Sequence, residues 1–98
     1  SPLYPEDEST ISDLTPLFIW ETAFGAQEYK FELAKDMNFN ELVFVSQLLS
    51  EPLTDRYLQL PDAYTLSTNQ TYFWRINSVS NNISTLCTGH FSFQTPPN

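Results

Sequence analysis

Residues 66–78 read Leu66-Ser-Thr-Asn-Gln-Thr-Tyr72-Phe-Trp74-Arg-Ile76-Asn-Ser78, and this stretch decides the fold. Its polar first half is typical of a turn, and its aromatic second half alternates as a half-buried strand does. Successive side chains of a strand point to opposite faces, which divides this strand into two sets. The buried set is Tyr72, Trp74 and Ile76. The outward set is Phe73, Arg75 and Asn77, the surface that we predict to be available to a partner.

The same alternation recurs along the chain and predicts an all-β fold. The clearest case is residues 28–35, where Tyr29, Phe31 and Leu33 share one face and charged side chains share the other. Further strands are predicted at residues 16–21, 41–49, 56–60, 71–79 and 90–95. Short strands at nearly regular spacing, without a convincing helix, indicate an antiparallel, immunoglobulin-like β-sandwich of about seven strands. The side chains expected in its core are Phe18, Trp20, Tyr29, Phe31, Leu33, Leu66, Tyr72, Trp74, Ile76, Phe91 and Phe93.

The composition indicates one compact domain and argues against two classes of partner. A chain of 98 residues suits a single core, which buries somewhat over ~60% of the surface that the unfolded chain exposes. Twelve acidic and four basic residues give a formal net charge of −8, which would repel the phosphates of nucleic acids and anionic lipids. The apolar runs are far shorter than the ~20 residues that span a bilayer. We therefore expect neither nucleic-acid binding nor membrane insertion.

Both ends of the chain have the composition of domain boundaries. Residues 1–13 contain two prolines and the cluster Glu6-Asp7-Glu8, which predicts an acidic lead-in or linker with a possible edge strand. The prolines of Thr95-Pro-Pro-Asn98 cannot donate to a strand ladder, so pairing is expected to stop there. The domain proper is therefore placed at residues 14–98. Because the chain begins at Ser1, we expect it to be a piece of a longer precursor.

Several short patterns occur in the order and at the spacing of one known family. Phe18-Ile-Trp20 and Tyr29-Lys-Phe31-Glu-Leu33 come first, and Leu66 lies six residues before Tyr72. The run Tyr72-Phe-Trp74-Arg-Ile76 and the closing Phe91-Ser-Phe93-Gln-Thr95 follow. Together, over residues 16–95, they resemble a fibronectin type III domain of the kind found as modules in bacterial extracellular proteins. In that family a buried tyrosine, here Tyr72, bonds back to the backbone of the preceding crossover loop.

The resemblance implies a non-catalytic role. A domain of this kind would act as a spacer or protein-interaction module of a larger secreted or cell-surface protein, with neighbouring domains of the same polypeptide as its partners and possible contact with another surface protein or a polysaccharide. An alternative is a carbohydrate-binding module, in which Phe73 would stack on a sugar ring while Arg75 and Asn77 bond its hydroxyls. Because the chain contains no Arg-Gly-Asp sequence, an integrin-type adhesion role is not implied.

Catalytic, metal-binding and cofactor-binding residues are not expected. His90 is the only histidine and has no acidic residue at a ligand-like offset, so it is interpreted as an exposed strand residue. Cys87 is the only cysteine, which excludes an intrachain disulfide and favours a small, partly buried hydrophobe.

Two further motifs leave alternatives open. The cluster Glu6-Asp7-Glu8 with Asp13 offers oxygens for Ca²⁺ but lacks the spacing of a dedicated calcium loop, so a solvated acidic segment is favoured. Asn69 and Asn82 each begin a glycosylation sequon, which matters only in a eukaryotic secretory chain.

Overall fold

The computed structural model confirms the predicted all-β sandwich and describes residues 4–21, 26–80, 83–86 and 90–97. The described strands are β1 (Ser9–Thr10), β2 (Leu17–Ile19), β3 (Glu28–Ala34), β4 (Leu42–Val45), β5 (Tyr57–Gln59), β6 (Thr71–Ser80), β7 (Ile83–Leu86) and β8 (Phe91–Gln94). Two 3₁₀ turns, η1 (Ser46–Leu48) and η2 (Asp62–Tyr64), are the only helical elements of the described chain.

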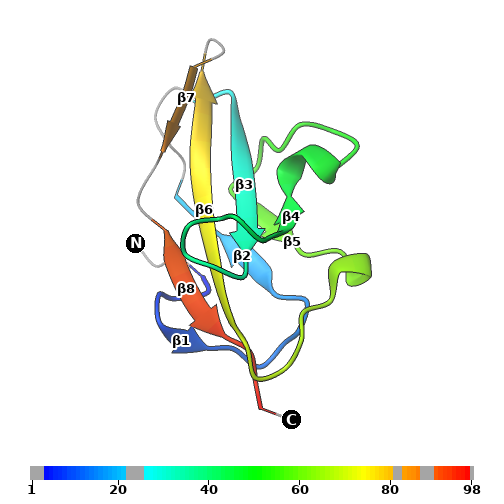
Figure 1. The fold of residues 1–98 in the computed structure, drawn as a ribbon. Coiled ribbons are helices and arrows are strands. Elements are labelled where there is room, and N and C mark those ends of the chain that lie inside the picture. The colour runs from blue at the N-terminus through cyan, green and yellow to red at the C-terminus, as the bar shows by residue number, and fades with distance from the viewer. Residues whose placement is uncertain (1–3, 22–25, 81–82, 87–89, 98) are drawn as a thin grey trace.

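The strands form one large sheet and one small sheet. The large sheet has the order β1-β8-β6-β3-β4, with β7 paired to β6, and the small sheet consists of β2 and β5. Figure 1 shows β6 and β3 running side by side along the length of the molecule, with β2 and β5 in the layer behind them. Among the described strands every pair is antiparallel except β1 with β8, which is parallel.

An aromatic cluster between the two sheets forms the core. Phe18 of the small sheet is fully buried, and its ring centroid lies 4.7 Å from that of Phe31, 5.3 Å from Trp74 and 5.9 Å from Phe93. These three partners belong to β3, β6 and β8 of the large sheet. Centroid separations in this range and tilted ring planes are the favourable geometry for aromatic pairs. The ring of Phe18 therefore joins the small sheet to three strands of the large one.

Of the side chains expected in the core, all but Phe91 are buried. Phe91 is half-buried, with its ring centroid 5.1 Å from that of Trp74. It is the first residue of β8, so its ring packs at the rim of the core. Alternation gives the face of a residue correctly but does not indicate how far a strand end lies from the centre of the sheet.

The N-terminal segment lies against the sandwich from Tyr4 onward. Tyr4 exchanges two backbone hydrogen bonds with Ile19 of β2, Pro5 is fully buried, and Ile11 is 4% exposed. Strand β1 then pairs with β8. Residues 4–13, placed in the acidic lead-in by composition, therefore supply a buried proline and an edge strand to the domain.

Two elements differ from the strands expected from the sequence. The predicted strand at residues 41–49 is shorter, because β4 ends at Val45 and the chain continues as η1. Strand β7 was not predicted, since Ile83-Ser-Thr-Leu86 does not alternate. No described helix is long and apolar enough to cross a membrane.

The hydroxyl of Tyr72 closes the turn that precedes β6. The backbone N–H of Ser67 donates a hydrogen bond of 3.0 Å to Tyr72 Oη, which is the bond to the crossover loop that the family resemblance implies for this tyrosine. The ring of Tyr72 is 3% exposed and stacks on Phe93 at 5.9 Å. The side chain thus ties the crossover loop to both β6 and β8.

We expect Tyr72→Phe to lower the free energy of unfolding by about 1 kcal/mol, because the partly buried Ser67 N–H loses its acceptor while the ring packing remains. Urea unfolding measures this difference. Tyr57→Phe is the matched control, since Tyr57 is 53% exposed. Equal unfolding midpoints for the two variants would show that the corner bond adds nothing to stability.

Candidate functional site

The outward set of β6, namely Phe73, Arg75 and Asn77, forms a stripe on the sheet. This outward stripe is covered in part by a loop of the same chain. In Figure 1 the loop between β3 and β4 crosses in front of β6 toward β8 and returns to β4. Phe39 lies in this loop and is only 8% exposed. Phe73, Arg75 and Asn77 are each half-buried. Part of the surface predicted to meet a partner is therefore already in contact with this loop, through Arg75 and Phe39.

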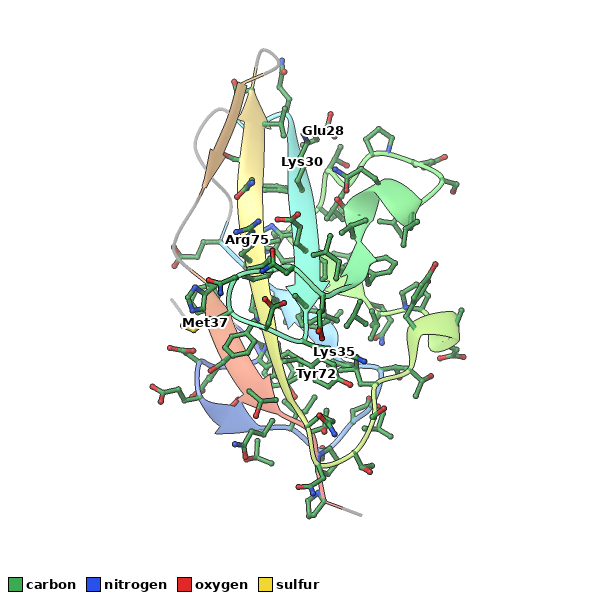
Figure 2. The ribbon with its side chains drawn as sticks, viewed as in Figure 1. Glu28, Lys30, Lys35, Met37, Tyr72 and Arg75 are labelled. Carbon is green, nitrogen blue, oxygen red and sulfur yellow. The ribbon has the colours of Figure 1, made fainter. Side chains whose placement is uncertain are left out.

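Arg75 is the centre of these contacts (Figure 2). Its Nε lies 2.6 Å from Glu32 Oε1 on the neighbouring strand β3, and its guanidinium carbon lies 4.1 Å from the centroid of the Phe39 ring. The side chains of Arg75 and Glu32 remain 35% and 25% exposed. A partly exposed ion pair contributes modestly, and a cation–π contact adds about 0.5–2 kcal/mol. Both interactions hold the guanidinium against the sheet.

His90 is exposed, as expected, and its ring contacts two phenyl groups. Its centroid lies 6.2 Å from Phe39 and 5.9 Å from Phe73, with both pairs edge-on. The Phe73 ring, itself half-buried, is thus in contact with His90. A partly covered ring offers less area for stacking on a sugar than an open one.

The carboxylate of Asp36 sets the shape of the loop that carries Phe39. Asp36 Oδ1 accepts hydrogen bonds from the backbone N–H groups of Asn40 at 2.9 Å and Glu41 at 2.8 Å. Phe39 has φ +57°, a left-handed conformation that costs a non-glycine residue about 1 kcal/mol. The bonds to Asp36 favour the turn that contains this residue. The bond from Glu41 N–H is the main reason that the pKa of Asp36 lies below its ordinary value of 3.8.

This lowered pKa predicts how stability changes in acid. Because the carboxylate is more acidic in the folded chain than in the unfolded one, its contribution is complete above the ordinary pKa of 3.8 and is lost as the pH falls through the folded-state value. Asp36→Asn should therefore destabilise the protein near neutral pH, with a difference from the parent protein that shrinks below about pH 4. Urea midpoints measured across this range test the prediction. Asp55→Asn, at an exposed position, is the control, and a pH-independent gap for Asp36→Asn would contradict it.

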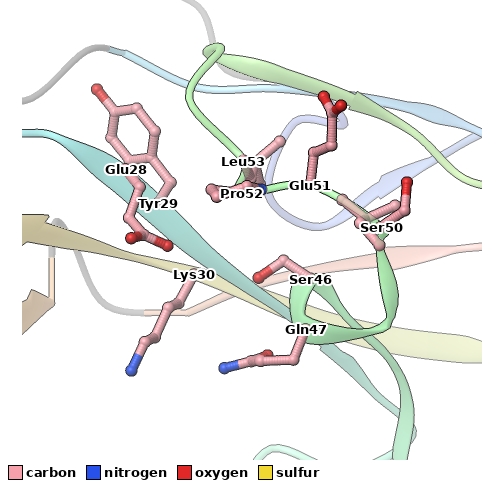
Figure 3. Close-up of a pocket in the computed structure, with 10 residues that line it drawn as sticks. Glu28, Tyr29, Lys30, Ser46, Gln47, Ser50, Glu51, Pro52 and Leu53 are labelled. Carbon is pink, nitrogen blue, oxygen red and sulfur yellow. The ribbon is translucent and has the colours of Figure 1, made fainter.

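A shallow pocket lies between the first half of β3 and the segment after β4. It has a volume of about 280 Å³ and is open to solvent (Figure 3). Its lining residues are Glu28, Tyr29, Lys30, Ser46, Gln47, Leu49, Ser50, Glu51, Pro52 and Leu53. Ser46 Oγ already accepts the N–H of Phe31 at 3.0 Å. The other lining residues include both acidic and basic side chains. Among them no nucleophile is shown in contact with a base, which is the arrangement that catalysis typically requires.

Of the acidic cluster at the N-terminus, the carboxylate of Asp7 and the backbone of Glu6 are used within the fold. Asp7 Oδ1 accepts the backbone N–H of Ser92 at 2.8 Å, and the carbonyl of Glu6 accepts both the N–H and the hydroxyl of Ser9. In the described part of the chain no group of three or more His, Cys, Asp or Glu residues is placed to hold a metal ion.

Of the two sequon asparagines and the single cysteine, only Asn69 lies among the residues that the structure describes. Asn69 is exposed, has φ +56° and donates its N–H to the Pro96 carbonyl. Asn82 and Cys87 lie outside the described residues.

Comparison with known proteins identifies the fold. No family model matches the chain, and no curated protein matches it. Among solved structures, an Fn3-like protein from Clostridium thermocellum superimposes with a TM-score of 0.66 at 18% sequence identity, over 99% of this chain and 91% of that one. The chain therefore has a fibronectin type III-like fold, as the order of its aromatic patterns predicted.

Proposed function

We propose that this domain is a non-catalytic spacer or protein-interaction module of a larger secreted or cell-surface protein. The observation that supports this most is the use of its polar and charged groups within the fold. Arg75 forms an ion pair with Glu32, and the carboxylate of Asp36 accepts a backbone N–H of its own loop. The side chains of Asp7 and Ser46 accept backbone N–H groups of β8 and β3. Groups engaged in this way fix a scaffold and are not available to activate a substrate.

Two contacts argue against the carbohydrate-binding alternative. That alternative required Phe73 to present a flat ring to a sugar beside free hydrogen-bonding groups. Phe73 is half-buried with His90 against it, and the guanidinium of Arg75 lies under Phe39. The partial cover of the stripe makes it a weaker candidate for a polysaccharide site.

The shape of the domain bears on how it would sit in a longer chain. Its principal extents are 44 × 28 × 22 Å, so it is elongated. The described chain starts beside β2 at the middle of the long axis and ends at the tip below β8 (Figure 1). A spacer built from this domain would therefore separate its neighbours by less than the full length of the sandwich. Neighbouring domains of the same polypeptide are its expected first partners.

Affinity electrophoresis of the isolated domain in gels that contain soluble polysaccharides tests this proposal, together with assays for hydrolysis of generic glycoside, ester and peptide substrates. We expect one cooperative unfolding transition, no retardation and no turnover. Retardation that Phe73→Ala abolishes and Leu48→Ala leaves intact would overturn the proposal in favour of sugar binding. Turnover by the isolated domain would overturn it in favour of an enzyme.

A further inference from the structure

The outer face of the small sheet carries a contiguous group of apolar side chains. Leu17 and Ile19 of β2 point away from the core, because Phe18 between them is fully buried. Tyr57 of β5 lies directly across from Ile19, and Tyr4 pairs with Ile19 from the other side. Residues paired directly across an antiparallel ladder share a face. Tyr4, Leu17, Ile19 and Tyr57 therefore form one surface, which we call the small-sheet patch.

Three side chains of this patch are open to solvent. Tyr4 is 42% exposed, Leu17 37% and Tyr57 53%, while Ile19 between the tyrosines is half-buried. Facing residues of an antiparallel pair have Cα atoms about 4.5–5.5 Å apart, so the two tyrosines start about 10 Å from each other across Ile19. Single exposed apolar residues are normal on a protein surface, whereas a contiguous group is a mark of an interaction site.

The two tyrosines of the patch differ from the other three of the chain. Tyr29, Tyr64 and Tyr72 each pack against another aromatic ring of the core. Within the part of the chain that the structure describes, the rings of Tyr4 and Tyr57 contact no other aromatic ring, and their hydroxyls make no hydrogen bond. Each therefore presents an uncommitted apolar ring beside an uncommitted hydrogen-bond donor, a combination that is enriched at protein interfaces.

The backbone beneath the patch is already paired on both sides of β2. Ile19 exchanges two backbone hydrogen bonds with Tyr4, of 3.1 and 2.8 Å, and β2 pairs with β5 from Leu17 to Ile19. A partner strand therefore cannot be added at β2. Strand β5 is only three residues long, and very short edge strands are one way in which proteins prevent strand addition. A partner would bind from above, through the side chains of the patch.

The chemistry of the patch favours a ligand that is apolar, uncharged and rich in hydrogen-bond acceptors. Leu17 and Ile19 offer no polar group, and the amide of Gln59, across from Leu17, already donates to the Thr15 carbonyl. A sugar bound over these aliphatic side chains would leave hydroxyls unpaired, which costs free energy. A polyproline II segment has apolar rings, no N–H at its prolines and carbonyls free of internal hydrogen bonds. Its groups match the tyrosine rings and hydroxyls.

We propose that the small-sheet patch binds a proline-rich segment of a partner protein in the polyproline II conformation. Pyrrolidine rings would pack on Tyr4, Ile19 and Tyr57, and carbonyls of the segment would accept hydrogen bonds from the two tyrosine hydroxyls. The inference rests on the proposed function as a protein-interaction module and specifies the surface and the chemistry of the partner. This chain itself carries Pro96-Pro97 just after its last strand, and a linker of similar composition in a neighbouring domain would supply such a segment.

Backbone amide NMR of the full chain with blocked hexapeptides tests the proposal. With hexaproline we expect saturable shift changes confined to residues 4, 17–19 and 57–59, which do not weaken at higher salt because the peptide is uncharged. A peptide of alternating glycine and serine should cause none, since it lacks both the rings and the preformed conformation. No saturable changes with hexaproline, or changes centred elsewhere, would overturn the proposal. Equal or stronger binding of a strand-forming peptide of alternating threonine and valine would do the same.

Substitutions separate the tyrosine rings from their hydroxyls. Tyr57→Ser should weaken binding of hexaproline about tenfold, since an aromatic side chain carries a large share of interface energy. Tyr57→Phe keeps the ring and removes the donor, so it should weaken binding about threefold. Leu48→Ser is the control, because Leu48 is 56% exposed on a different element and should leave the affinity unchanged. A folded Tyr57→Ser variant, with the unfolding midpoint of the parent protein, that binds hexaproline equally well would contradict the proposed contact.

The remaining outcomes separate this inference from the proposed function. Shift changes in the patch on addition of cellohexaose would show that a sugar binds there, and would overturn both proposals. Shift changes that depend on protein concentration alone would show that a second copy covers the patch. They would overturn the assignment to a proline-rich partner and leave the non-catalytic module intact, as would the failure of hexaproline to bind.

Discussion

Phe18→Ala is expected to lower the free energy of unfolding by about 3–5 kcal/mol, the typical cost of removing a buried phenyl ring. Phe18 is fully buried and contacts Phe31, Trp74 and Phe93. It lies where the two-stranded sheet packs on the six-stranded one, so the cavity would lie between the layers. Domains of this size have about 5–15 kcal/mol of stability in total, and the variant should therefore be close to unfolding at room temperature.

Leu17→Ala provides the matched control for this prediction. Leu17 precedes Phe18 on the same strand, points to the opposite face and is 37% exposed. A substitution there should change the free energy of unfolding, measured in urea, by about 0.5 kcal/mol or less. If both variants lose similar stability, strand propensity of β2 and not inter-sheet packing would be the dominant effect, and the placement of Phe18 at the centre of the core would be wrong.

The alternation of side chains predicted the elements that depend on short-range pattern. In β3, Tyr29, Phe31 and Leu33 are buried and Lys30 is exposed, as their spacing requires. In β6 the same rule separates Tyr72, Trp74 and Ile76 from Phe73, Arg75 and Asn77. These two strands pair along the whole of β3. The period-two pattern is reliable here because one face of the sheet is buried. A register shift of one residue would move the apolar side chains to the solvent-exposed face.

Alternation could not predict that the loop between β3 and β4 covers part of the outward stripe. Alternation shows that Arg75 points away from the core, but its contact with Phe39 joins two segments that are far apart in the sequence. Phe39 falls between the strands predicted at residues 28–35 and 41–49, where the pattern assigns it no role. The available signal was the phenylalanine itself, since a large aromatic between Asn38 and Asn40 is unusual in a polar turn and suggests a buried position.

The outer face of strand β2 had a comparable signal in the sequence. Leu17, Phe18, Ile19 and Trp20 are consecutive apolar residues, so any strand through them is apolar on both faces. Only Phe18 and Trp20 were assigned to the core, and the opposite face was left without a role. The structure adds what the sequence lacks, namely that Tyr57 and Tyr4 join the two remaining side chains from either side. Pairing between distant segments is what turns scattered apolar residues into a surface.

Phe39→Ala is expected to lower the free energy of unfolding by about 2–3 kcal/mol, less than a central core residue because Phe39 packs on one face of the sheet only. The variant loses the ring over Arg75 and the edge contact with His90. Alanine also retains the left-handed backbone cost at this position, where φ is +57°. Phe39→Gly removes that cost as well as the ring, so it should be about 1 kcal/mol more stable than Phe39→Ala.

Met37→Ala is the control in the same loop, because Met37 is 56% exposed and should change stability by about 0.5 kcal/mol or less. Amide and side-chain NMR shifts of Arg75 and Phe73 should move in both Phe39 variants as the ring current is lost, and should stay in place in Met37→Ala. If Phe39→Ala behaves like Met37→Ala in both stability and shifts, the loop does not cover the stripe in solution. Phe73 and Arg75 would then be open to solvent, and the carbohydrate-binding alternative would recover the surface that it needs.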